Sequence, residues 1–260
     1  MKSTHVGMGV VIIEDAFEVD ADLLSRYLTW LGDGNEQTFI VAEDGTLAIN
    51  QTGFKFDVND MNLAPGRFLD LDGSRANREP SLDFLQFRDK MEEAAYSCLV
   101  EYCSYFPDAA TTSWWRPSGH IAYYGPGQRI GPHCDDQIPF EWGESPQNQV
   151  SIHNNVSINL YLNNYGKDYS GGQIRFPQIP YLHSPKVGSA AIYPSNYIGR
   201  HEVLPVTSGL RVAFLTMACY GVSDGMIVGS EMPYRYWMPN LIKDLSTRRG
   251  ERQGYQEPKQ

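Results

Sequence analysis

The residues with the clearest potential for chemistry are His133 and Asp135, in the run His133-Cys134-Asp135. On a β-strand, residues i and i+2 point to the same side, so the imidazole and the carboxylate would project together while Cys134 points away. These groups are two members of the 2-His-1-carboxylate set, which binds non-haem iron(II) and leaves coordination positions open. Such a spacing also arises by chance, so the pair alone is weak evidence for a metal site.

Further motifs surround this pair in a fixed order. Along the chain they are Tyr124-Gly-Pro-Gly-Gln128, Gly131-Pro132-His133, Tyr161-Leu-Asn163, Gly171-Gly172-Gln173-Ile174-Arg175-Phe176-Pro177, Pro185-Lys-Val-Gly188, Ile192-Tyr193-Pro194 and His201-Glu-Val-Leu-Pro-Val-Thr-Ser-Gly-Leu-Arg211. In order and spacing, residues 120–220 resemble the prolyl 4-hydroxylase-like branch of the iron(II)/2-oxoglutarate oxygenases. Several linked motifs are far more specific than any single one.

The resemblance implies a metal site and a reaction. His133, Asp135 and His201 match the iron ligands and are the expected catalytic residues. The implied cofactors are Fe(II), 2-oxoglutarate and O2, with ascorbate as an accessory reductant. The implied activity is a dioxygenase that hydroxylates an unactivated C–H bond while 2-oxoglutarate is decarboxylated to succinate. Related halogenases have Gly or Ala at the position of Asp135, so a carboxylate there favours hydroxylation.

The resemblance also implies a cosubstrate site. Arg211, ten residues after His201, matches the base that pairs with the distal carboxylate of 2-oxoglutarate. Family members often have Lys at this position, and the planar guanidinium of Arg211 preserves the chemistry because it can hold a carboxylate through two hydrogen bonds. Tyr161 resembles the tyrosine that helps bind that carboxylate. Tyr124 resembles the aromatic residue near the metal-chelating end.

The elements that must position these residues are short strands. Between Trp114 and Tyr220, runs of Ile, Val, Tyr, Phe and Thr alternate with Gly, Pro and Asn clusters, which is typical of a sandwich or barrel. We therefore expect a mainly β fold with flanking helices. Its core would be a double-stranded β-helix (jelly-roll or cupin-like) over residues 113–222.

Alternation along two of these strands suggests which side chains face the cavity. In the strand 156–162, the residues expected to face inward are polar: Ser157, Asn159 and Tyr161. In the strand after Gly172, the corresponding residues are Gln173 and Arg175. Buried polar groups are costly unless they meet a ligand or water, so two adjacent strands are expected to line one cavity. Asn159, Gln173 and Arg175 are thus candidate substrate residues, although Arg175 could equally pair with a neighbouring Asp.

The remaining segments are expected to support this core as parts of one domain, residues 1–260. Residues 1–112 should supply a strand (Val10–Ile13) and two helices, one capped by Asp20 and ending at Leu31, the other running from Ser81 to about Tyr105 and stopped by Pro107. A hairpin is predicted around residues 43–45. Residues 223–260 form a C-terminal extension with a frayed tail from about residue 240. Residues 136–155 are long for a connection, which suggests a substrate lid.

Other candidate residues have simpler interpretations. His183 is the rival third metal ligand, but it lies between Pro180 and Pro185 and is predicted to be a loop residue. His120 is predicted to be buried on a strand, and His5 and His153 to face solvent. Cys134 is expected to be an ordinary packed thiol. The pair Trp114-Trp115 could stack a substrate, but divides more naturally between core and surface.

Composition limits the partners. The chain of 260 residues has 21 basic and 31 acidic residues, a net charge of −10, so a nucleic-acid partner is not expected. The spacing of the four cysteines fits neither a CxxC metal site nor a disulfide-dense scaffold, which suggests free thiols and a cytoplasmic location. No segment has the apolar length of a membrane span, so no membrane partner is expected. The oligomeric state stays open.

The function predicted from the sequence is thus an iron- and 2-oxoglutarate-dependent hydroxylase. Its substrate would be a prolyl or other peptidyl residue, or a free amino acid-like small molecule. A different class of function is a non-catalytic double-stranded β-helix that binds a metal or ligand. A zinc hydrolase is a third class, but it has no use for Arg211 and Tyr161.

Overall fold

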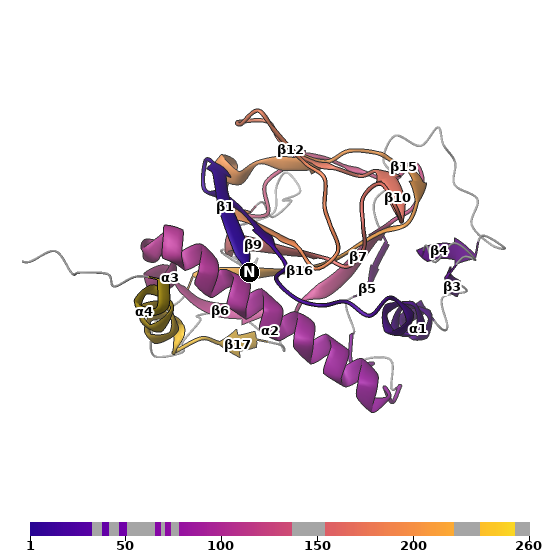
Figure 1. Ribbon diagram of the computed structural model, residues 1–260, viewed down its shortest axis with the longest axis horizontal. Coiled ribbons are helices and arrows are strands. Elements are labelled where there is room, and N and C mark those ends of the chain that lie inside the picture. The colour runs from indigo at the N-terminus through magenta and orange to yellow at the C-terminus, as the bar shows by residue number, and fades with distance from the viewer. Residues whose placement is uncertain are drawn as a thin grey trace, which may run out of the picture.

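A computed structural model of the chain describes residues 1–32, 38–41, 47–50, 66–68, 71–73, 78–136, 154–220 and 235–252 (Figure 1). The helices are α1 (Ala21–Gly32), α2 (Leu82–Tyr105), α3 (Pro107–Thr112), the 3-10 turn η2 (Tyr197–Gly199) and α4 (Leu241–Arg252). The strands are β1 (Lys2–Gly7), β2 (Val10–Glu14), β3 (Thr38–Val41), β4 (Leu47–Asn50), β5 (Gly66–Phe68), β6 (Ser113–Pro117), β7 (His120–Tyr124), β8 (Ile130–His133), β9 (Asn154–Tyr161), β10 (Tyr169–Gly171), β11 (Ile174–Phe176), β12 (Tyr181–His183), β13 (Ala190–Pro194), β14 (His201–Val203), β15 (Val206–Gly209), β16 (Arg211–Tyr220) and β17 (Arg235–Trp237).

Two antiparallel sheets form the core. Within the described ranges, the larger sheet has nine strands, with the path β1-β2-β13-β9-β16-β6-β17 and with β7 joining β5 to β16. The smaller sheet has the order β12-β11-β14-β8, and β10 pairs with β15 beside it. Apolar side chains from both sheets, including Tyr161 and Phe176, form one buried cluster between them. This is the predicted mainly β fold with a jelly-roll core, and the prediction is confirmed.

The helices cover the outer face of the larger sheet. The long helix α2 runs across this sheet, with α4 and α3 near its C-terminal end and α1 toward its N-terminal end (Figure 1). The predicted alternation of β9 is confirmed, because Ile158 and Leu160 pack with α2 in the outer core cluster while the intervening residues point inward. One face of β9 therefore anchors the helices, and the other faces the space between the sheets.

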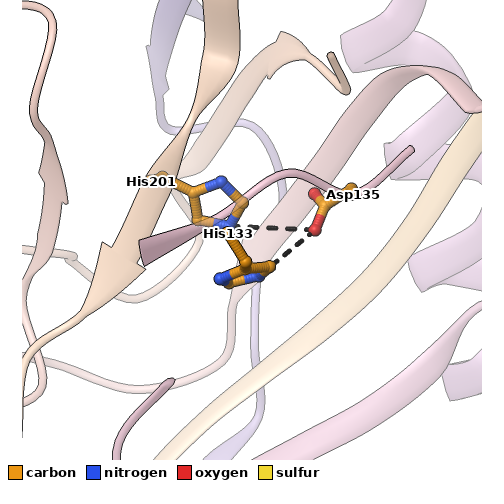
Figure 2. A group of neighbouring side chains, drawn as sticks. All are labelled: His133, Asp135 and His201. Carbon is orange, nitrogen blue, oxygen red and sulfur yellow. Dashed lines mark ion pairs between the residues drawn. The ribbon is translucent and has the colours of Figure 1, made fainter. Parts of the chain in front are cut away.

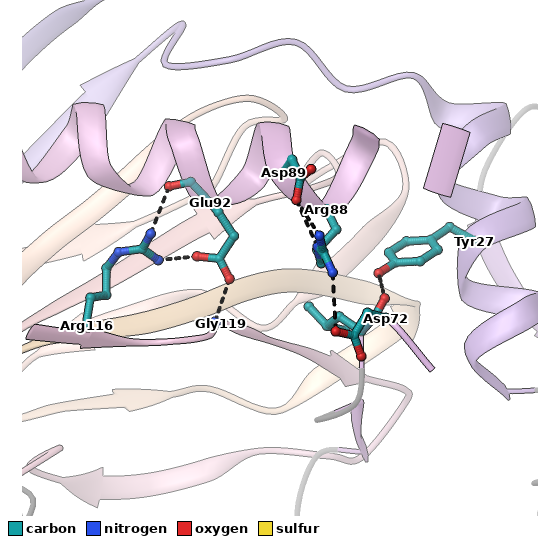
Figure 3. A network of polar contacts seen from close by, with 8 residues as sticks. Tyr27, Asp72, Arg88, Asp89, Glu92, Arg116 and Gly119 are labelled. Carbon is teal, nitrogen blue, oxygen red and sulfur yellow. Dashed lines mark hydrogen bonds and ion pairs between the residues drawn. The ribbon is translucent and has the colours of Figure 1, made fainter. Parts of the chain in front are cut away.

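Buried polar contacts fix α2 on the sheet (Figure 3). Glu92 on α2 accepts hydrogen bonds from Arg116 of β6 and from the backbone N–H of Gly119, the latter at 2.8 Å. Both charged side chains are almost fully buried, and each has the other as its ionic partner, as buried charges require. A Cβ at Gly119 would lie 1.9 Å from the Phe214 ring, so any side chain there would displace this ring. A second ion pair, between Arg88 and Asp72, ties the start of α2 to residues 71–73.

Several local predictions hold. Asp20 caps α1, since its carboxylate accepts hydrogen bonds from the backbone N–H groups of Asp22 and Leu23, both at 3.0 Å. The predicted hairpin is present as the antiparallel pair β3–β4, although residues 42–46 between them lie outside the described part of the chain. The four cysteines are buried and form no disulfide bonds. Among the described residues, no helix has the length and apolar character that crossing a bilayer would need.

Other local predictions were wrong or incomplete. The helix predicted from Ser81 to about Tyr105 is confirmed as α2, which ends before Pro107. The short helix α3, in which Pro107 occupies the first position and its missing N–H costs nothing, was not predicted. The tail is not frayed from residue 240, because α4 continues to Arg252 and buries Leu241 and Leu245. Two polar contacts hold it, Tyr96 to Asp244 and Arg248 to Glu101. The strand β1, which pairs with β2, was not predicted.

Candidate metal and cosubstrate site

Two histidines from the smaller sheet lie side by side. His133 ends β8 and His201 begins β14, and the antiparallel register pairs them directly, with ring centroids 4.3 Å apart. The Oδ1 atom of Asp135 lies 3.4 Å from Nε2 of His133 and 3.9 Å from Nε2 of His201. The possible ligand atoms of the three residues all lie within 4.8 Å of one another, and Figure 2 shows the side chains converging.

The larger sheet holds the carboxylate. Asp135 lies in a turn just after β8, so the prediction that it shares a strand with His133 was wrong. Its backbone N–H donates to the carbonyl of Ser195, after β13, at 2.9 Å, and Ser157 of β9 donates its hydroxyl to Oδ2 at 2.5 Å. Burial alone would raise the pKa of Asp135, but the neighbouring imidazoles of His133 and His201 and the hydrogen bond from the Ser157 hydroxyl lower it to about 2. Asp135 is therefore an anion at neutral pH.

The histidines present the nitrogen that a metal needs. Nδ1 of His133 lies 2.8 Å from the carbonyl of Gly131, and Nδ1 of His201 lies 3.1 Å from the carbonyl of Gly199. These carbonyls can only accept, so each Nδ1 carries the proton and each Nε2 keeps its lone pair for a metal. Burial lowers the pKa of His201, with partial opposition from Asp135, which favours the neutral ligand form.

Tyr193 connects this group to β9. Its hydroxyl lies 3.0 Å from Nε2 of His201 and accepts a hydrogen bond from Nδ2 of Asn159 at 2.8 Å. Asn159 was a candidate substrate residue, and the structure shows its amide facing Tyr193, one step from the metal-binding group. A substrate role for Asn159 stays a prediction. The donor set of two imidazoles and one carboxylate fits iron(II) with open positions.

A buried cation lies on the same inner face. Arg211 at the start of β16 is 2 % exposed, and its guanidinium lies over the rings of Tyr124 and Tyr161, 4.7 and 5.6 Å from their centroids. Among the described residues, no carboxylate pairs with Arg211, and its Nε and the Tyr161 hydroxyl make no hydrogen bond. An isolated buried cation is costly, so this corner is suited to binding an anion such as a carboxylate. Both Tyr124 and Tyr161 therefore lie at Arg211, and their separate roles stay predictions.

The Gly171-Gly172 motif makes room for Arg211. Gly172 has φ +64°, and a Cβ there would lie 2.9 Å from Cδ of Arg211 and 2.8 Å from Val206. Tyr169, just before the motif, points its hydroxyl into the same corner, where burial raises its pKa to about 12 against the opposing charge of Arg211. The motif thus lets the strand pass close to the guanidinium.

His183 is the residue that the sequence interpretation misplaced. It lies on β12, not in a loop, and is 5 % exposed. Its ring centroid is 5.2 Å from that of Tyr161, and its Nε2 makes no hydrogen bond among the described residues. Burial, and then the charge of Arg211, lower the pKa of His183 to about 4. His183 therefore lies close to Arg211 and is not a rival metal ligand. The sequence did not reveal this position, because its strand has only three residues and prolines lie on both sides of it.

The depressed pKa of His183 predicts a pH-dependent stability. In the unfolded chain its pKa returns to about 6.5, so acid protonates the unfolded state first and favours unfolding. The native state of the metal-free protein should therefore lose roughly 3 kcal/mol through this group as pH falls from 6.5 to 4. Urea unfolding at several pH values measures this loss. His183→Gln should remove this part of the pH dependence, whereas His5→Gln, on exposed β1, should retain it; identical slopes in all three proteins would contradict the assignment.

The prediction of which residues of β11 point inward was wrong. Ile174 and Phe176 are the buried residues of this strand and join the inner cluster with Tyr161. Arg175 points outward and pairs with Glu202, and the Gln173 amide donates to the Ser184 hydroxyl at 2.9 Å. Apolar residues occupy the inner positions of β11 because they pack there against the buried cluster between the sheets. Moreover, β9 and β11 belong to different sheets, so they are not adjacent strands.

The remaining predictions fall in other parts of the molecule. Cys134 is buried, as expected for a packed thiol. His120 lies on β7, opposite Leu215 of β16. Trp114 and Trp115 lie on β6 and are both partly buried. The predicted lid is almost entirely outside the described residues, as are Trp142 and His153.

Comparison with known proteins identifies the core. The family model of the 2OG-Fe(II) oxygenase superfamily matches residues 119–217, which include all three metal-binding candidates and Arg211. Residues 119–217 are thus similar to the 2OG-Fe(II) oxygenase superfamily. The cofactors of this superfamily are Fe(II), 2-oxoglutarate and O2, and both the three-residue donor set and the unpaired Arg211 fit them.

Individual relatives match only part of this chain. A PKHD-type hydroxylase of Psychrobacter sp. is 35% identical over 95 residues, which is 36% of this chain and 34% of the relative. Procollagen-lysine,2-oxoglutarate 5-dioxygenase 2 of Homo sapiens is 37% identical over 73 residues, or 26% of this chain and 10% of the relative. The chain spans less than half the length of the curated relatives it matches.

A solved structure shares the fold. The prolyl hydroxylase from Trichoplax adhaerens, solved in complex with a hypoxia inducible factor oxygen degradation domain peptide fragment, has a TM-score of 0.50. The similarity covers 82% of this chain and 84% of that chain at 13% sequence identity. At this identity, the comparison establishes the fold alone, in agreement with the two facing sheets described above.

Proposed function

We propose that the protein is a 2-oxoglutarate- and iron(II)-dependent dioxygenase that hydroxylates an unactivated C–H bond. The observation that supports this most directly is the combination of two sites on the inner faces of the two sheets. One is the donor set of His133, Asp135 and His201, and the other is the buried, unpaired Arg211. Neither a non-catalytic metal-binding protein nor a zinc hydrolase has a need for the buried, unpaired Arg211.

Each residue then has a physical task. The Nδ1–carbonyl contacts of His133 and His201 fix the direction of their Nε2 lone pairs, and Ser157 orients the carboxylate of Asp135. Arg211, with the Tyr161 hydroxyl, would hold the distal carboxylate of 2-oxoglutarate. Bound together, iron(II), 2-oxoglutarate and O2 supply the oxidant for hydroxylation and yield succinate and CO2.

The names of the relatives bear on the substrate class. The relatives bear the names PKHD-type hydroxylase and procollagen-lysine,2-oxoglutarate 5-dioxygenase, which favour hydroxylation of an amino-acid side chain. We propose a prolyl or other peptidyl residue, with a free amino acid-like molecule as the second candidate. Succinate release over a panel of peptides and free amino acids distinguishes them.

The free thiols support a cytoplasmic location. A role for ascorbate stays a prediction.

Anaerobic spectroscopy tests the cofactor assignment before any substrate is known. The protein should bind one Fe(II), and 2-oxoglutarate should then produce a visible charge-transfer absorption band, because it chelates the open metal positions. As isolated, the site is expected to carry Zn or Ni, which imidazole-containing sites prefer to Fe(II), so the metal is removed and replaced first. A fully iron-loaded protein that gives no band with saturating 2-oxoglutarate would refute the proposed chelation.

A further inference from the structure

His183 points into the space between the sheets. On β12 it pairs with Ile174 of β11, whose side chain is fully buried in the inner cluster. Its neighbour Leu182 is 46% exposed and lies on the opposite face of the strand. The position of His183 is therefore set by the pleat of the smaller sheet, and it faces Arg211 and Tyr161 on the larger one.

The contacts of His183 leave one ring nitrogen unused. Its ring stacks on Tyr181, with centroids 6.2 Å apart and an interplanar angle of 18°, and it is tilted against Tyr161 at 5.2 Å. These rings hold the imidazole in place without satisfying Nε2. Among the described residues, four buried polar groups from four strands thus lack hydrogen bonds in one corner: Nε2 of His183, the hydroxyls of Tyr161 and Tyr169, and Nε of Arg211. Buried polar groups are normally paired, so such a cluster indicates a polar ligand.

The charge state of His183 defines what it can offer. At neutral pH it is uncharged, since burial and Arg211 lower its pKa to about 4. A neutral imidazole has one N–H donor. The corner therefore has one permanent cation, Arg211, and directional neutral donors around it. This matches a single carboxylate, because a bidentate guanidinium uses only two of its roughly four lone-pair sites.

We propose that His183 donates a hydrogen bond to the distal carboxylate of 2-oxoglutarate, beside Arg211 and Tyr161, and so selects a cosubstrate with a second carboxylate. This inference rests on the proposed function, because it concerns the same cosubstrate. It assigns to His183 a positioning role that requires no protonation change and no contact with the metal.

The test compares two ligands that share the chelating end. 2-Oxoglutarate and 2-oxopentanoate both carry a 2-oxo acid, but only the former has a distal carboxylate. Binding of each to the Mn(II)-loaded protein is measured by calorimetry, which requires no turnover. In His183→Leu, the affinity for 2-oxoglutarate should fall about 10- to 100-fold, the effect of losing one hydrogen bond to a charged group. The affinity for 2-oxopentanoate should stay unchanged, and His183→Gln, which retains an N–H donor, should keep most of the preference.

The outcomes separate this inference from the proposed function. An equal loss for both ligands would show that His183 only supports the fold, and no loss for either would show that it makes no contact; both overturn the inference while leaving the function intact. A wild-type protein that binds Mn(II) but neither ligand would overturn both. His5→Leu, at an exposed position, is the matched control and should bind both ligands as the wild type does.

Discussion

Asp135→Ala is expected to abolish turnover while leaving the protein folded. Asp135 is the only anionic group in the donor set, so its loss leaves two neutral imidazoles to hold the metal. Iron affinity should fall by more than the roughly 10- to 100-fold that follows the loss of a ligand's own hydrogen-bond partner. The fold should survive, because the contact with Ser195 uses the backbone N–H, which alanine retains. Metal binding, succinate release and oxygen consumption with saturating Fe(II) measure the effect.

The neighbouring residue provides the control for this experiment. Asp136→Ala removes an exposed carboxylate one position further along the same turn and should leave metal binding and succinate release unchanged. Circular dichroism and thermal melts of the metal-free proteins check that both variants fold. Full activity in Asp135→Ala would eliminate the proposed donor set. Loss of activity in both variants would instead show that the turn itself is required.

Arg211→Ala should weaken 2-oxoglutarate binding by about 2–5 kcal/mol, with little change in metal affinity. The reason is that a carboxylate would remain in a buried corner without its only cationic partner. Calorimetric titration of 2-oxoglutarate into the Mn(II)-loaded protein measures this difference directly. Arg211→Lys should restore part of the affinity, because it keeps the charge but not the planar fork.

Arg175 offers a matched comparison for Arg211. It is an arginine of the same core, but it points outward and pairs with Glu202. Arg175→Ala should therefore bind 2-oxoglutarate as tightly as the wild type. Should Arg211→Ala do the same, the assignment of the cosubstrate site would be incorrect. A large effect of Arg175→Ala would revive the substrate role that the sequence suggested for it.

The sequence predicted the grouping of the metal and cosubstrate candidates because linked motifs constrain several positions at once. His133, Asp135, His201 and Arg211 lie at fixed intervals along the chain, and the structure brings the first three together and buries the fourth. Alternation worked on β9 because its outer face meets a helix, which demands apolar residues there. The alternation pattern gave the wrong inner face for β11. Polar and apolar residues both recur at every second position of this strand, so the pattern cannot show which of the two faces packs against the other sheet.

His183 and α4 were missed for different reasons. A strand of three residues is too short to show a periodic pattern, and prolines nearby indicate a loop. The charged sequence of α4 contains few apolar residues, so its stability depends on partners on α2, 140 residues and more away, that no local pattern can reveal. The treatment of residues 1–260 as a single domain stays a prediction.

The division of the donor set between the two sheets links metal binding to folding kinetics. His133 and His201 belong to the smaller sheet, whereas Asp135 is anchored through Ser157 and Ser195 to the larger one. An ion bound by all three would be a crosslink across the sandwich, joining segments that are far apart along the chain. The sheets could then separate only as the ion departs, so the metal would act chiefly on the unfolding rate. Because such long-range pairings form late in folding, nascent chains would acquire the metal only after both sheets have closed.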